Sequence, residues 1–83
     1  MTPHVAACRI AHISNQAAGG DLLARADLAL ALAAMEFFTG DVLEVFVGAL
    51  EPGAAKHLID GHGAKITNLN PRLADLLIER GMV

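Results

Sequence analysis

The hydrophobic residues of this chain fall into short blocks separated by glycine, proline, asparagine and aspartate. Residues 5–14 (VAACRIAHIS) place Val5, Ile10 and Ile13 ahead of the loop-like segment 15–21, and they predict a first strand. Residues 22–38 are rich in alanine and leucine and follow Asp21, a good N-cap, so they predict a helix.

The second half of the chain continues this alternation. Residues 42–47 (VLEVFV) form a β-branched and aromatic run that predicts a strand buried on both faces. Residues 54–60 predict a short helix that ends at Gly61-His62-Gly63, and residues 64–69 (AKITNL) predict a third strand. Asn70-Pro71 is typical of a helix start, and an apolar stripe follows it. That stripe consists of Leu73, Leu76 and Leu77.

The predicted order of elements is β-α-β-α-β-α. Strand–helix–strand units require right-handed crossovers, so the order predicts one α/β domain over residues 1–83, built on a small parallel sheet. Three strands leave both sheet edges unpaired, and we expect oligomerisation to cover them. The leucines at 28 and 32, with Met35, Val45 and Phe46, are the expected core.

Composition limits the possible partners and compartment. The 83 residues are 54% hydrophobic and 18% charged, which is unusually apolar for a small monomer and points to a further subunit. The net charge is −3 and the basic residues do not cluster, so no direct nucleic-acid partner is expected. No apolar run approaches the ~20 residues of a membrane span, and the amino terminus resembles no export signal. We therefore expect a cytoplasmic protein.

Cys8 is the only cysteine and forms part of a regular pattern with His4 and His12. On a helix this i, i+4, i+8 spacing would place three metal-ligand types on one face. On the predicted strand, neighbours in the trio would lie ~13 Å apart, too far for one ion. We therefore predict no metal site and no cofactor, and a small buried thiol at Cys8.

Two further segments could carry binding or proton transfer. The Gly19-Gly20-Asp21 loop joins a strand to a helix, where α/β proteins bind anions, although a flexible turn is the simpler interpretation. His57 and His62 flank the end of a short helix, where they could transfer protons, bind a metal or cap carbonyl groups.

Glu44 stands in the middle of the second predicted strand. A buried carboxylate without a partner is costly, so we expect Glu44 to face a subunit boundary or to pair with an arginine such as Arg9.

Residues 20–46 (GDLLARADLALALAAMEFFTGDVLEVF) resemble the sulfur-relay family of DsrE, DsrF and DsrH and of TusB, TusC and TusD, most closely its DsrF/TusC branch. The likeness lies in Leu23-Ala24-Arg25, in the helix body ending near Phe37, and in Val45-Phe46. It implies a flavodoxin-like oligomeric scaffold. The persulfide-carrying cysteine of that family is absent from Asn68-Leu69-Asn70. The resemblance therefore implies a non-catalytic subunit, not an enzyme on its own, with Cys8 as the one candidate catalytic thiol.

A second resemblance leads to a different function. The segments GDLLARADLALAL, DVLEVFV and GAKITNLNPRLADLLIERGM are also similar to the STAS domains of anti-sigma-factor antagonists. Those domains carry a phosphorylatable serine where this chain has Leu50-Glu51-Pro52-Gly53. This resemblance implies a regulatory domain that acts by docking to other proteins.

Overall fold

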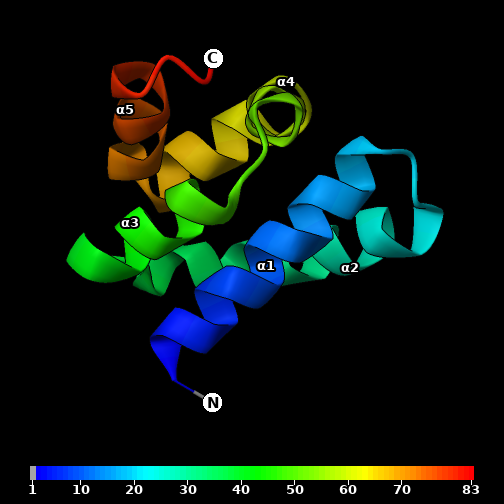
Figure 1. Ribbon diagram of the computed structural model, residues 1–83, viewed down its shortest axis with the longest axis horizontal. Coiled ribbons are helices and arrows are strands. Elements are labelled where there is room, and N and C mark those ends of the chain that lie inside the picture. Colours follow the sequence, from blue (N-terminus) through cyan, green and yellow to red (C-terminus); the bar gives the residue numbers. More distant parts are fainter. Residues whose placement is uncertain (1) are drawn as a thin grey trace.

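The computed structural model describes residues 2–83, which form five α-helices and one 3-10 helix and contain no β-strand (Figure 1). In chain order the elements are α1 (Pro3–Ala18), α2 (Leu22–Ala31), η1 (Leu32–Phe37), α3 (Gly40–Ala49), α4 (Pro52–Leu69) and α5 (Pro71–Glu79). The predicted α/β fold with a parallel sheet is therefore wrong. The fold is an all-α bundle around one hydrophobic core.

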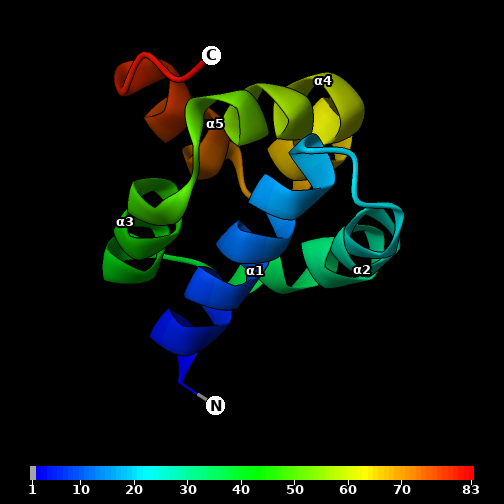
Figure 2. The ribbon, with the colours of Figure 1, turned by 45° about the vertical axis from the view of Figure 1, so that its right-hand side comes forward.

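Helix α1 is the centre of the bundle. It crosses the middle of the molecule and packs against α2, α3 and α4 (Figures 1 and 2). Its buried positions are mostly small, which allows neighbouring helices to approach closely: Ala7, Ile10, Ala11, Ser14 and Ala17. The buried Ser14 hydroxyl donates to the Ile10 carbonyl at 2.8 Å, so it leaves no unpaired polar group in the core.

The first predicted strand, residues 5–14, lies entirely within α1. The buried residues Ala7, Ile10, Ala11 and Ser14 follow the i, i+3, i+4, i+7 spacing of one helix face. Thr2 starts the helix, because its hydroxyl accepts a hydrogen bond from the Val5 amide at 3.2 Å. The β-branched residues gave the wrong prediction because strand propensity is weak compared with this periodicity.

The second predicted strand, residues 42–47, belongs to α3. Here too the buried residues have helical spacing, at Leu43, Phe46, Val47 and Leu50. Glu44 lies on the opposite, exposed side of the helix, where its carboxylate contacts the guanidinium of Arg80. Glu44 therefore pairs with an arginine as expected, but the partner is Arg80 and not Arg9, and the carboxylate is exposed instead of buried.

The third predicted strand, residues 64–69, is the second half of α4. The expected helix end at Gly61-His62-Gly63 is a kink inside α4, with His62 at φ −135° and ψ 15°. Buried side chains lie on both sides of the kink, Leu58 before it and Ile66 after it. Gly61 and Gly63 locally weaken the helix, but packing of α4 against α1, η1 and α5 keeps the chain helical on both sides of the kink.

The two other predicted helices are confirmed. Residues 22–37 form α2 and η1, and the Asp21 carboxylate accepts from the Ala24 amide at 3.0 Å as the expected N-cap. Helix α5 buries the predicted leucine stripe. Asn70 does not cap α5 with its side chain. Its buried side-chain amide donates instead to the carbonyls of Met35 and Phe38, both at 2.8 Å.

The expected core residues Leu28, Leu32, Met35 and Phe46 are buried, and Val45 packs against them from a half-buried position. Sheet edges do not exist in this fold, so they give no reason for oligomerisation. None of the helices formed by residues 2–83 combines the length and hydrophobicity that crossing a bilayer requires.

Candidate functional site

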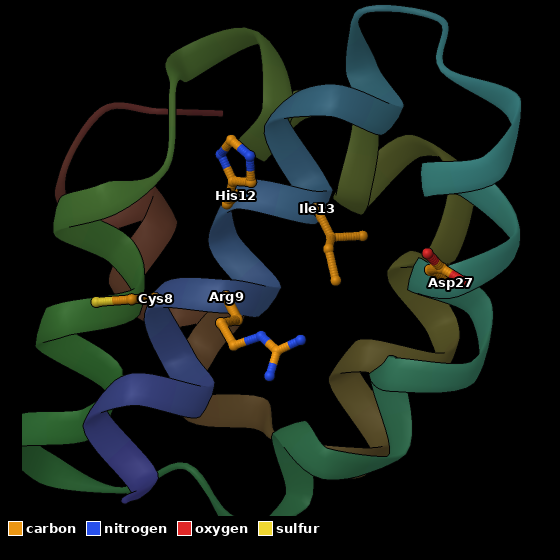
Figure 3. Close-up of a pocket in the computed structure, with 5 residues that line it drawn as sticks. All are labelled: Cys8, Arg9, His12, Ile13 and Asp27. Carbon is orange, nitrogen blue, oxygen red and sulfur yellow. The ribbon is translucent and has the colours of Figure 1, made fainter. Parts of the chain in front are cut away.

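An open groove of about 430 Å³ lies between α1 and α2 (Figure 3). Helix α1 contributes Cys8, Arg9, His12 and Ile13, and α2 contributes Asp27. All of these residues are exposed except the half-buried Ile13. The groove thus combines one cation, one anion, one thiol and one imidazole around a small apolar floor.

The side chains of the groove do not converge on one point. The Cys8 side chain points away from Arg9 and Asp27, and the His12 ring extends in a third direction (Figure 3). The ion pairs found within residues 2–83 are Arg72–Glu79 and Arg80–Glu44, so Arg9 and Asp27 face one groove without pairing. Nucleophilic catalysis needs a thiol and a base within hydrogen-bond reach, and these side-chain directions do not provide that arrangement.

The metal-ligand pattern of α1 needs a correction. His4, Cys8 and His12 lie on a helix and not on a strand, so the spacing does place them on one face. His4 and His12 are nevertheless two turns apart, about 12 Å along the axis. Within the described part of the chain, no three His, Cys, Asp or Glu side chains come close enough to hold a metal ion.

The predicted site residues are spread over three places. Cys8 is exposed on α1 and not buried as expected, and it alone among them lines the groove. Gly19, Gly20 and Asp21 form the turn between α1 and α2, where the Asp21 carboxylate already accepts a backbone amide. His57 and His62 are half-buried along α4. The structure therefore does not bring the predicted residues together.

A different surface stands out on α2, and sequence reasoning missed its role. Six exposed apolar residues lie within about 120° of the helix circumference, directly opposite the buried Leu28. They are Leu22, Leu23, Ala26, Ala29 and Leu30 on α2 and Ala33 at the start of η1, and we refer to all six as the α2 outer face. The three leucines are 76%, 80% and 82% exposed. Charged residues occur only at its two margins, Arg25 on one side and Asp27 on the other.

Other helices of the bundle have polar outer faces. Helix α1 exposes Arg9, His12 and Gln16, and α5 exposes Arg72, Asp75 and Glu79. Helix α2 is apolar on its core side as well, through Ala24 and Leu28. A helix that is apolar on two opposite sides normally has both of them covered. Yet α2, apart from η1 that continues it, packs against α1 alone.

The signal for this surface is present in the sequence. Alanines cover the faces of residues 22–38 that the leucines at 28 and 32 leave open, which permits close approach of another helix. Sequence alone does not show which side of α2 meets the core. The position of α1 in the structure shows which side of α2 is packed and that the opposite side is uncovered.

Comparison of the chain with protein-family models, with curated proteins and with solved structures found no match. The resemblances to the sulfur-relay family and to STAS domains both depended on aligning predicted strands with a parallel sheet. Residues 42–47 and 64–69, which carried that alignment, are helical. Neither resemblance therefore supports a function for this fold.

Proposed function

We propose that this protein is a small self-associating helical module, in which the α2 outer face docks onto a second copy of the chain. The observation that supports this most directly is a helix that is apolar on both sides yet packed on only one. An exposed patch of this kind is typical of interaction sites.

The composition of the α2 outer face suits pairing with itself. Leu22 and Leu30 project from a surface otherwise formed largely by Ala26 and Ala29. A second α2 can approach closely at the alanines and place its own leucines over them, as side chains of packed helices interdigitate. No charge lies within the face, so two identical faces meet without burying an ion.

The size of the surface sets the strength of the association. Three leucines and three alanines expose roughly 300–400 Å² of apolar surface area per copy, as obtained from the transfer free energies of these side chains. Stable specific interfaces bury about 800 Å² per partner. We therefore expect a weak, reversible dimer with a dissociation constant in about the micromolar range.

Sedimentation equilibrium from 5 µM to 1 mM tests the proposal. We expect the wild-type chain to dimerise, and Leu30→Glu to raise the dissociation constant at least tenfold, because it places a carboxylate within the apolar face, at its most exposed leucine. Ile78→Glu is the matched control, because Ile78 is also exposed, at 64%, but lies on α5, away from α2 (Figures 1 and 2).

Circular dichroism should show unchanged helicity for both variants, since both positions are exposed. A wild-type chain that stays monomeric at 1 mM contradicts the proposal. So does a dimer that Leu30→Glu and Ile78→Glu weaken to the same extent.

A further inference from the structure

The margins of the α2 outer face carry opposite charges. Arg25 and Asp27 are both exposed, and on the side of the outer face they are about 200° apart around the helix axis, so each lies about 100° from the middle of that face. The apolar face lies between them. Neither residue takes part in an ion pair within residues 2–83, so each charge is available to a partner.

From these two residues we infer that the two copies pack with their α2 helices parallel, and that Asp27 of each copy pairs with the partner's Arg25. The inference rests on the proposed self-association and specifies its geometry. Asp27 and Arg25 would then act as specificity-determining residues of the interface.

Two-fold symmetry determines which relative orientation of the two α2 helices brings the oppositely charged margins together. When two identical helices pack face to face and antiparallel, the symmetry axis brings each margin against the same margin of the other copy. Asp27 would then oppose Asp27, and Arg25 would oppose Arg25. When the helices are parallel, the axis runs along them and each margin meets the opposite one. Only the parallel arrangement therefore brings the two signs of charge together, as flanking charges do in parallel coiled coils.

The local structure fits this contact. Arg25 and Asp27 are two residues apart, about 3 Å along the axis, so opposed margins place them at nearly the same height. The Arg25 Nε donates to the Ala17 carbonyl at 3.1 Å, which fixes the guanidinium near the end of α1. Its terminal amino groups remain free to donate to a carboxylate.

Arg9 is the other charged side chain near the Asp27 margin. It lines the α1–α2 groove together with Asp27 but forms no ion pair with it. The carboxylate oxygens of Asp27 are therefore not paired with Arg9 and are free to accept hydrogen bonds from a second copy.

Disulfide trapping tests the orientation directly. Leu22→Cys and Ala33→Cys are each introduced into a Cys8→Ser chain, which has no other thiol. The two positions lie about 16 Å apart along the helix, far beyond the reach of one disulfide. In an antiparallel pair, a residue lies opposite its own copy only near the symmetry axis. Because the two positions are far apart along the helix, at most one of the two variants can then form a disulfide with its own copy. In a parallel pair both can, and we expect both to form covalent dimers.

Charge substitution gives an independent readout. Asp27→Asn should weaken the dimer roughly two- to tenfold, because it removes two exposed ion pairs. An antiparallel dimer would be strengthened instead, because the same change removes a like-charge contact. Asp41→Asn, at an exposed position of α3, is the matched control and should leave the dissociation constant unchanged. Added salt should also weaken a parallel dimer.

The outcomes separate this inference from the proposed function. A monomeric wild-type chain overturns both. A wild-type dimer in which only one cysteine position self-cross-links, or which Asp27→Asn tightens, overturns the parallel orientation and leaves self-association in place.

Discussion

The side-chain amide of Asn70 donates a hydrogen bond to the backbone carbonyl of Phe38, at 2.8 Å and across 32 residues of sequence. The same amide donates to the Met35 carbonyl, also at 2.8 Å. The Phe38 carbonyl lies just beyond η1, and the Met35 carbonyl lies near the end of η1, where it also accepts from the Phe38 amide at 3.1 Å. Asn70, which stands between α4 and α5, thus holds the end of the α2–η1 segment in place.

Asn70→Ala should lower the free energy of unfolding by roughly 1–3 kcal/mol, because it removes two buried hydrogen bonds and leaves the Phe38 carbonyl without a donor, whereas the Met35 carbonyl keeps the Phe38 amide. Urea unfolding followed by circular dichroism measures the change. Asn68→Ala is the control, because Asn68 is exposed on α4 and makes no side-chain hydrogen bond in the described structure. Equal free energies of unfolding for the two variants would show that the Asn70 hydrogen bonds make no net contribution to stability.

The contrast between Asn70 and the α2 leucines shows how far the sequence could predict this molecule. The Asn70-Pro71 pair correctly marked a helix start, since proline fits the first turn. The partners of the Asn70 side chain could not be predicted, because they lie more than thirty residues away. Local rules place the element, whereas packing decides where the side chain goes.

The strand predictions failed for a related reason. A six-residue apolar run such as residues 42–47 suits a strand or a buried helix equally well. Including Leu50, four residues beyond Phe46 and directly after α3, reveals the helical period, because both residues are buried. The candidate site depended on the same choice. An uncovered apolar face can be identified on α2 only after α1 is known to be helical and packed against its other side.

Phe46→Ala should cost roughly 3–5 kcal/mol of unfolding free energy, because it removes a fully buried ring from the core. The Phe46 ring also packs against Phe38, with centroids 5.6 Å apart. Phe37→Ala is a matched control at a ring that is 76% exposed, and it should change stability by less than about 0.5 kcal/mol. Thermal unfolding of both variants checks this, and a similar loss in each would contradict the assigned core.

Glycine-to-alanine changes should have opposite effects at two positions. Gly48 lies within α3, and a Cβ added there meets no atom within 4 Å, so Gly48→Ala should stabilise the fold by roughly 0.5–1 kcal/mol. Gly20 has φ +101°, a conformation that alanine rarely adopts, so Gly20→Ala should destabilise it by about 1 kcal/mol or more. The denaturation midpoints of the two variants show whether each change stabilises or destabilises the fold. Stabilisation by Gly20→Ala would contradict the turn geometry between α1 and α2.

Cys8 should react readily with a thiol reagent in the native protein, because its side chain is exposed on α1 and not buried as a strand position would be. Reaction with Ellman's reagent should release one equivalent of thiolate, at a rate within about tenfold of the rate in urea, since exposure is one of the main controls on thiol reactivity. Because the Cys8 side chain lies on α1 and points away from Arg9 and Asp27, blocking it should leave the dimer intact (Figure 3). Sedimentation of the alkylated protein checks that second expectation. A thiol that reacts only after unfolding would contradict the packing of α1, and a dimer lost on alkylation would place α1, not α2, at the interface.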